Sequence, residues 1–264
     1  MKLVENRLIS AGSDGYIRFW DGPAINTGES DEQFNLFAKP EKEIYFESVN
    51  GGPAHIVWID MGEDFWIVQD ALGRTWKYEL EGEKKTEILR YNSGRFNDFA
   101  LSPLNNCLIS TGQDGVVRLW DYGTQREFYN TFFQTKAEST CVEWLPFSKK
   151  NYGRMIVVGF SDGIVRFLFL NDTGFQLVQA FKVHKNKVIK IKSNREGTII
   201  VVADTAGSLF FISLESPVLS KIVPYCLFET GFKINDLCWD RNGQKILLAC
   251  NDGRLHEINI PKEK

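Results

Sequence analysis

The sequence has no long run of apolar residues and no strong excess of one charge. No apolar stretch approaches the roughly 18 residues that a membrane-spanning helix needs. The first ten residues, MKLVENRLIS, also lack the long apolar stretch of a secretory signal. The net charge of −3 disfavours a general nucleic-acid binder or a protein that binds acidic membranes. We therefore expect a soluble intracellular chain that binds neither nucleic acid nor membrane.

Cysteine and histidine are too few and too scattered to indicate a redox or metal site. The five cysteines are an odd number and lie in or beside apolar, strand-like runs, which is typical of reduced, buried thiols. The three histidines, His55, His184 and His256, lie far apart in the sequence without metal-ligand spacing. The stretch RLHEINI predicts that His256 points outward from a strand. We expect no metal ion and no other cofactor.

Motifs of catalysis are also missing. The sequence contains no G-x-S-x-G elbow, no Walker loop and no dinucleotide-binding fingerprint. The stretch QDALGRTW is close to the Asp-box of sialidases, but two residues separate Asp70 from Gly73 where that motif has one. No acidic position repeats in a way that would place carboxylates around a central channel. We expect neither a catalytic site nor a small-molecule substrate.

What the sequence does contain is a repeat. Six segments combine an apolar pair, a tight turn with glycine and an alternating strand: LISAGSDGYIRFWD from Leu8, FWIVQDALGRTWKYEL from Phe65, LISTGQDGVVRLWD from Leu108, MIVVGFSDGIVRFLFL from Met155, TIIVVADTAGSLFFISL from Thr198 and KILLACNDGRLHEINI from Lys245. Asp-Gly between alternating apolar segments is a strong hairpin signal, because the turn needs a positive φ that glycine adopts freely. The turn glycines recur about every 45 residues, which is the period of WD40 propellers.

Short strands flank most of these hairpins. A strand before the hairpin is predicted by FNDFALSPLNN, TCVEWLPFSKK and INDLCWDRNGQ, and a strand behind it by EIYFES, REFYNTFF and FQLVQAF. No window of about 11 to 18 residues has convincing helical periodicity. The sequence therefore predicts an all-β fold, a WD40 β-propeller of about six four-stranded blades.

The first and last hairpins lie close to the ends of the chain, which affects how many strands we expect in the first and last blades. The first hairpin begins at Leu8 with no room for a strand before it, and the last ends near Ile260 with no strand after it. We therefore expect the first and last blades to be incomplete, and residues 1–264 to form a single propeller domain within a longer multi-domain protein. Six such units suit a seven-bladed ring completed by flanking sequence, or an open arc. The polar stretch GPAINTGESDEQ after Asp21 predicts a loop insertion on one rim.

Two repeats carry the polar residues of a WD signature. These residues are Ser10, Asp14 and Trp20 in the first repeat, and Ser110, Asp114 and Trp120 in the third. We predict a buried network in which the tryptophan ring N–H donates to the serine hydroxyl and the aspartate anchors a neighbouring loop, since an unpaired buried donor costs about 1–3 kcal/mol. A catalytic acid is the alternative for the aspartates, and we favour the structural role. His55 and His184 are candidate histidine partners, in units that lack the full set.

Other polar residues are candidate partner contacts. They are Asn97, Asp98, Asn235, Asp236, Lys182, Lys185 and Lys187. The two Asn-Asp pairs fall at equivalent places in two inner strands, where they either lie on a rim or complete a turn; we favour the turn. The basic run KVHKNKVIKIK either binds an acidic partner such as a tubulin tail or forms a solvated loop and strand edge; we favour the second.

Several unusual variants, and their order, resemble one family. The stretches are LISAGSDGYIRFWD, WIVQDALGRTWKYEL, SGRFNDFALSPLNNCLISTGQDGVVRLWDY, RMIVVGFSDGIVRFLFL, FKVHKNKVIKIKSNREGTIIVVADTAGSLFFISL and INDLCWDRNGQKILLACNDGRLHEINIP. From about residue 8 to residue 261, the chain resembles the WD-repeat region of the cilia- and flagella-associated protein 44 family.

This resemblance implies a scaffold of the ciliary axoneme. Members of the family have tandem N-terminal propellers followed by long coiled coils, and they form part of the tether that holds the motor heads of an inner dynein arm to the doublet microtubule. The implied partners are tether proteins, the dynein arm and the microtubule surface. The resemblance carries no catalytic or contact residue over to this chain. The alternatives are a propeller hydrolase, or a generic WD40 adaptor of the nucleus or cytoplasm.

Overall fold

The computed structural model describes residues 2–4, 7–21, 39–48, 51–61, 64–90, 96–124, 126–133, 137–146, 153–214 and 222–261. These residues form antiparallel β-sheets of a WD40 β-propeller and one short 3₁₀ turn, η1 (Glu81–Glu83). Within these ranges no helix is long and apolar enough to cross a membrane. The chain divides into two compact units, Met1–Asn92 and Ser93–Lys264, which we call the N-terminal and C-terminal units. The expectation of a single domain stays a prediction.

The N-terminal unit contains two four-stranded sheets, blades 1 and 2. Blade 1 consists of β1 (Lys2–Val4), β2 (Arg7–Ala11), β3 (Tyr16–Asp21) and β4 (Lys42–Tyr45), and blade 2 of β5 (Ile56–Met61), β6 (Phe65–Asp70), β7 (Arg74–Glu79) and β8 (Lys85–Arg90). The expectation that blade 1 lacks its first strand is wrong, because β1 pairs with β2 in the register Leu3↔Leu8. A three-residue strand fits into the short segment before the first hairpin. The predicted loop insertion lies outside the described residues.

The C-terminal unit contains blades 3 to 6. Blade 3 consists of β9 (Phe96–Leu101), β10 (Cys107–Gly112), β11 (Val117–Asp121) and β12 (Arg126–Thr131), and blade 4 of β13 (Ser139–Trp144), β14 (Met155–Phe160), β15 (Ile164–Asn171) and β16 (Gly174–Lys182). Blade 5 consists of β17 (Val188–Ser193), β18 (Ile199–Asp204), β19 (Ser208–Ser213) and β20 (Val223–Glu229), and blade 6 of β21 (Ile234–Trp239), β22 (Lys245–Cys250) and β23 (Leu255–Asn259). As expected for the last blade, its sheet has three strands in the described part of the chain.

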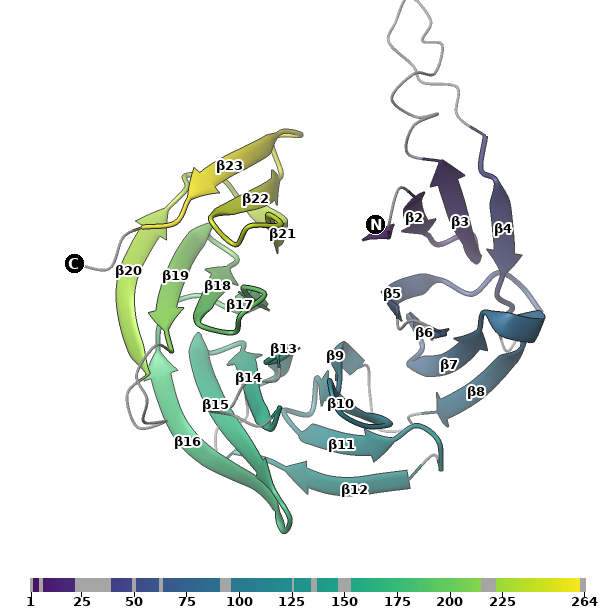
Figure 1. Ribbon diagram of the computed structural model, residues 1–264, viewed down its shortest axis with the longest axis horizontal. Coiled ribbons are helices and arrows are strands. Elements are labelled where there is room, and N and C mark those ends of the chain that lie inside the picture. The colour runs from purple at the N-terminus through teal and green to yellow at the C-terminus, as the bar shows by residue number, and fades with distance from the viewer. Residues whose placement is uncertain are drawn as a thin grey trace, which may run out of the picture. The chain divides into compact units, whose positions relative to one another are not determined.

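Within the C-terminal unit the blades lie side by side. Figure 1 shows their first strands, β9, β13, β17 and β21, along the inner side, and the last strands, β12, β16 and β20, along the outer side. All six predicted hairpins are present as antiparallel pairs, three of them being β2–β3, β10–β11 and β22–β23. The inner and outer strands that flank them are confirmed as well.

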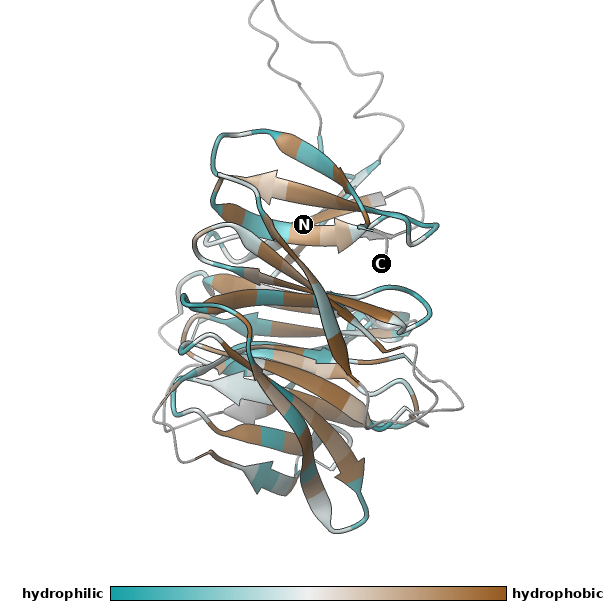
Figure 2. Ribbon diagram, turned by 90° about the vertical axis from the view of Figure 1, so that its left-hand side faces the viewer, coloured by the Kyte–Doolittle hydropathy of each residue, from teal (hydrophilic) through white to brown (hydrophobic). Residues whose placement is uncertain are grey.

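The core lies between neighbouring blades, because successive side chains of a strand point to opposite faces. In β14, Met155 and Val157 pack in a cluster shared with blade 5, whereas Ile156 and Val158 pack in a cluster shared with blade 3. All six residues of β14 are therefore buried. Figure 2 shows hydrophobic colour along the strands and hydrophilic colour at many of the connecting turns. The strand β14 thus joins blade 4 to both of its neighbours, blades 3 and 5.

Candidate functional site

The tryptophan–serine part of the WD signature is present in both predicted copies. The ring N–H of Trp20 donates to the hydroxyl of Ser10 over 2.8 Å, and that of Trp120 donates to Ser110 over the same distance. Ser110 is fully buried, whereas both tryptophans are partly buried. The bond joins the two strands of one hairpin, so it stabilises the hairpin that carries it.

The aspartates of the signature are not part of a buried network. Asp14 and Asp114 lie in exposed turns. Each forms an ion pair with an arginine four residues later, Arg18 at 2.6 Å and Arg118 at 2.7 Å. The hydrogen bond from Arg18 is the main reason why the pKa of Asp14 lies below its ordinary value. Each carboxylate is thus paired with a guanidinium on the adjoining strand of the same hairpin.

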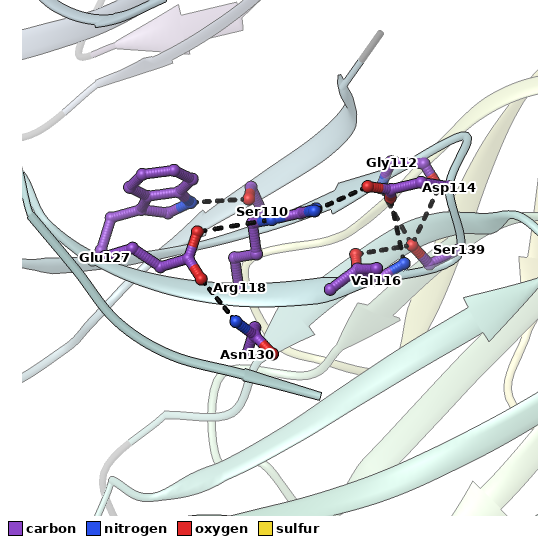
Figure 3. Close-up of polar contacts among 9 residues, drawn as sticks. Ser110, Gly112, Asp114, Val116, Arg118, Glu127, Asn130 and Ser139 are labelled. Carbon is purple, nitrogen blue, oxygen red and sulfur yellow. Dashed lines mark hydrogen bonds and ion pairs between the residues drawn. The ribbon is translucent and has the colours of Figure 1, made fainter. Parts of the chain in front are cut away.

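In blade 3 the arginine extends this ion pair to the outer strand. Figure 3 shows Arg118 between Asp114 and Glu127, with Asn130 beyond Glu127. The guanidinium Nε lies 3.4 Å from the Glu127 carboxylate, and the Asn130 amide donates to the same carboxylate over 2.7 Å. Turn, central strand and outer strand of one blade are therefore joined by polar contacts.

A residue that the sequence reasoning missed joins blade 3 to blade 4. Ser139, the first residue of β13, is fully buried, and its hydroxyl accepts the N–H of Gly112 over 2.9 Å. The hydroxyl oxygen also lies 3.1 Å and 3.2 Å from the carbonyl oxygens of Gly112 and Val116, where it can donate (Figure 3). The available signal was a small polar residue at the first position of the inner strand β13.

The histidine that we considered for the network, His184, has a buried partner that the sequence reasoning did not name. Its Nδ1 lies 3.3 Å from Oδ2 of Asp204, and the two side chains are 1% and 2% exposed. Asp204 also accepts the backbone N–H groups of Ala206 and Ser208 over 2.9 Å and 2.8 Å, and the Asn186 amide over 3.2 Å. Burial lowers the pKa of His184, against the opposing effect of the Asp204 charge.

Blade 2 uses its aspartate in the same turn position. Asp70 lies three residues before the turn glycine, as Asp204 does, and accepts the N–H groups of Leu72 and Arg74 over 2.9 Å each. It is 1% exposed. His55, the other candidate histidine, is exposed, and its backbone carbonyl accepts the N–H of Ala71. A buried Asp–His pair is therefore formed between Asp204 of blade 5 and His184, which lies in the connection from blade 4 to blade 5.

The two Asn-Asp pairs do not complete turns, contrary to the interpretation that we favoured. Asn97 and Asp98 lie within the inner strand β9. The Asn97 amide donates to the carbonyl of Ser139 over 2.8 Å, and Asp98 accepts the N–H of Val142 over 3.0 Å, both on the inner strand of the next blade. Burial raises the pKa of Asp98. This pair links blade 3 to blade 4.

The second pair lies on β21 and is exposed. Asp236 forms an ion pair with Lys190 of β17 at 2.8 Å, and Asn235 is exposed beside it. Between blades 4 and 5, the Glu143 carboxylate lies 2.9 Å from the ammonium of Lys192. Charged side chains of the inner strands β13, β17 and β21 therefore pair across neighbouring blades.

The three lysines of the basic run have different environments. Lys187 pairs with Glu138 of the neighbouring blade at 3.1 Å. Lys182, the last residue of β16, donates to the carbonyl of Asp162. Lys185 is exposed. The run is therefore partly a strand edge and partly a set of inter-blade contacts.

Two open pockets lie in the N-terminal unit. The first, of about 420 Å³, is lined by Phe19, Glu41, Lys42, Ile44, Tyr78 and Leu80. The second, of about 540 Å³, is lined by aromatic residues together with Arg74 and Lys85. Lys42 pairs with Glu83, Arg74 pairs with Glu87, and Lys85 donates to a backbone carbonyl. These cations of the two pockets are thus already bound to acceptors of the protein.

Comparison with known proteins agrees with this geometry. The family described as WD domain, G-beta repeat matches residues 4–21 and 84–121. The chain carries WD40 repeats. This WD40-repeat chain is similar to "Cilia- and flagella-associated protein 44" of Mus musculus, with 28% identity over an alignment of 285 residues. The alignment covers 99% of this chain and 15% of the mouse protein. The chain is 24% identical, over 272 residues, to the protein of the same name from Trypanosoma brucei brucei, covering 96% and 15%. The predicted resemblance is confirmed.

The WD40-repeat chain spans about 15% of the length of these curated relatives. Among solved structures, the computationally designed Ika8 protein is similar, with a TM-score of 0.66 and 14% identity, covering 98% of this chain and 70% of that one. At this identity the similarity shows the fold alone.

Proposed function

We propose that this chain is a WD40 propeller region of a ciliary or flagellar scaffold protein, and that it acts by binding other proteins, not by catalysis. The observation that carries the proposal is the similarity, over 99% of the chain, to a mouse protein named for its association with cilia and flagella. A trypanosome protein of the same name supports it. Since the chain spans about 15% of these relatives, we propose that it is one part of a longer multi-domain protein.

The contacts between neighbouring blades of the C-terminal unit support such a role. Its blades share buried clusters, and hydrogen bonds and ion pairs of the inner strands join blade 3 to 4, 4 to 5 and 5 to 6. A preformed surface loses little conformational entropy when it binds a partner. Repeat architectures present large surfaces of this kind.

Several large apolar side chains are exposed on the outer strands of this unit. The large apolar side chains exposed there are Phe128 on β12, Leu177 on β16, and Val223, Leu227 and Phe228 on β20. Exposed apolar groups on several neighbouring strands favour protein contacts. We propose that axonemal proteins bind there, with the tether proteins, an inner dynein arm and the doublet microtubule as the partners that the family resemblance implies.

Cell fractionation tests the ciliary part of the proposal. An antibody against the 264-residue chain is used to blot purified axonemes beside the cell-body fraction. We expect a band in the axonemes far above the 30.2 kDa of this chain. A band of about the chain's own mass, confined to the cell body, would contradict the proposal and support a free-standing WD40 adaptor of the cytoplasm or nucleus.

A variant of the outer strand β20 tests whether its exposed apolar side chains bind axonemal proteins. Leu227→Ser combined with Phe228→Ser removes two exposed apolar side chains from β20, and Leu104→Ser removes one that is 54% exposed in a loop. In cells that express the tagged full-length protein, we expect the β20 variant to lose most of its axonemal signal and its crosslinks to axonemal proteins. Equal incorporation of the β20 variant and the loop control would show that this surface is not the one that binds.

A further inference from the structure

The hairpin of blade 6 departs from those of blades 1 and 3 at two positions. In blades 1 and 3, the aspartate before the turn glycine pairs with an arginine four residues later. In blade 6 the aspartate is Asp252, and the residue four positions later is His256. The residue two positions before the aspartate is glycine in blades 1 and 3, but Cys250 in blade 6. Both departures place a metal-ligating side chain beside the same carboxylate.

The structure brings the three side chains together. One ligand atom from each of Cys250, Asp252 and His256 lies within 4.8 Å of the other two, and the Nε2 of His256 lies 2.8 Å from Oδ2 of Asp252. In a tetrahedral zinc site, with Zn–S of about 2.3 Å and Zn–N or Zn–O of about 2.0 Å, the ligand atoms are about 3.3–3.5 Å apart. Side-chain rotations that shift these atoms by about 1 Å convert the present arrangement into that geometry.

The backbone and one ring hold the ligands in place. The N–H of Cys250 donates to the carbonyl of Arg254 over 3.2 Å, and the N–H of Arg254 donates to Oδ1 of Asp252 over 3.0 Å. This leaves Oδ2 of the carboxylate directed at the histidine. The ring of Phe232 stacks on His256 with centroids 4.6 Å apart and planes 20° apart, which fixes the plane of the imidazole.

The site has a closed side and an open side. Cys250 is 5% exposed and belongs to the core cluster shared by blades 5 and 6. The turn itself is open, since a Cβ on Gly253 would meet nothing within 4 Å. In Figure 1 the turn joins the two yellow strands β22 and β23. An ion can therefore enter from the turn, with the thiol beneath it and room for a water molecule above.

We propose that Cys250, Asp252 and His256 bind one Zn²⁺ ion, with water as the fourth ligand. A thiolate, an imidazole and a carboxylate form a donor set that suits zinc and is too soft for calcium or magnesium. Binding replaces the thiol proton of Cys250 by the ion, so one proton is released for each ion bound. This revises the expectation that no histidine of the chain ligates a metal, which rested on spacing along the sequence.

Cobalt binding provides the test, because Co²⁺ takes zinc sites and its thiolate complexes absorb in the near ultraviolet. The reduced 264-residue chain is titrated with Co²⁺ and then with Zn²⁺, in a Cys238→Ala background that removes the exposed thiol. We expect a thiolate–cobalt charge-transfer band that saturates at one equivalent and disappears when Zn²⁺ is added. Absence of the band would overturn the proposal.

His256→Arg is the matched control, because arginine occupies this position in blades 1 and 3 and pairs there with the turn aspartate. We expect this variant to keep the circular dichroism spectrum of the parent chain and to lose the band, with zinc affinity reduced at least about 100-fold. Cys250→Ser should lose the band as well. A band that persists in either variant would show that the ion binds elsewhere, and the proposal would be wrong.

Discussion

An aspartate near the hairpin turn has two different environments in this chain, and its distance from the turn glycine decides which. When it directly precedes the glycine, as Asp14 and Asp114 do, it is exposed and pairs with an arginine of the adjoining strand. When it lies three residues before the glycine, as Asp70 and Asp204 do, it is buried and accepts two backbone N–H groups of the turn. A histidine lies beside one aspartate of each kind: His184 beside the buried Asp204, and His256 beside Asp252, which directly precedes its glycine.

The buried pair predicts a dependence of stability on pH. Because burial lowers the pKa of His184, the unfolded chain binds a proton as the pH falls through the ordinary histidine pKa of about 6.5, whereas the folded chain binds it only at lower pH. The free energy of unfolding should therefore fall as the pH falls from 7 through about 6.5, by up to about 1.4 kcal/mol per pH unit. Urea unfolding at pH 7.5, 6.5 and 5.5, values chosen around that pKa of about 6.5, measures this.

His184→Gln is the control for this prediction. The glutamine amide keeps an N–H donor for Asp204 but does not titrate. The variant should show a flatter profile than the parent chain over the same pH range. If the two profiles have the same slope, the dependence comes from other groups, and the assignment to His184 is wrong.

At this scale the sequence predicted contacts within a hairpin but not contacts between blades. The bond between Trp120 and Ser110 was predictable, because both residues lie on two strands joined by one tight turn. The bond between Asp98 and Val142 was not, because it joins two strands 44 residues apart whose separation depends on how whole blades pack. The cluster around Cys250 lies within one hairpin and was still missed, because the expectation rested on the spacing of the three histidines and did not consider a cysteine and an aspartate beside His256.

The hairpin is the element whose prediction was most reliable, because its turn chemistry and its alternation are both local signals. Asp-Gly or a similar turn, flanked by apolar alternation, specifies a pair of strands without help from the rest of the fold. The strand β1 was missed because three residues carry too little pattern to be recognised alone. Its partner β2 supplies the pairing that defines it.

Two turn glycines with similar backbone conformation should respond very differently to substitution. Gly207 has φ of 92°, and a Cβ there would lie 1.8 Å from the carbonyl oxygen of Phe232; Gly253 has φ of 76°, and a Cβ there would meet nothing within 4 Å. Gly253→Ala should cost only the conformational strain of about 1–2 kcal/mol. Gly207→Ala should cost at least about 3 kcal/mol, because it also forces two backbone segments apart.

Chemical denaturation of the two alanine variants measures the difference, with Gly253→Ala as the matched control. Equal losses of stability would mean that the turn at Gly207 and the loop before β21 can separate at no cost in free energy. The close contact between them would then not stabilise the fold. The same contact recurs at Gly163, where a Cβ would lie 2.2 Å from the carbonyl oxygen of His184. Close approach of the turn to the next loop is therefore a repeated element of the C-terminal unit.

At the scale of the whole molecule, the buried clusters follow the division into two units. One cluster lies within the N-terminal unit, between blades 1 and 2. Three lie within the C-terminal unit, between blades 3 and 4, 4 and 5, and 5 and 6. The sequence predicted the repeat, but its even rhythm gave no sign of this division, because every hairpin carries the same local signals.

These clusters predict that residues 93–264 fold without residues 1–92. In a repeat architecture each blade is stabilised chiefly by its neighbours, and blades 4 and 5 keep both of theirs in the shorter chain. The isolated segment should be monomeric and show the far-ultraviolet circular dichroism of β-sheet. It should also show a near-ultraviolet signal from its packed aromatic residues, and this signal should disappear in one cooperative unfolding transition. The segment 1–92, with one shared cluster, should unfold at a lower urea concentration. A segment 93–264 that lacks the near-ultraviolet signal would show that blade 3 needs the N-terminal unit in order to pack, and that the two units fold as one.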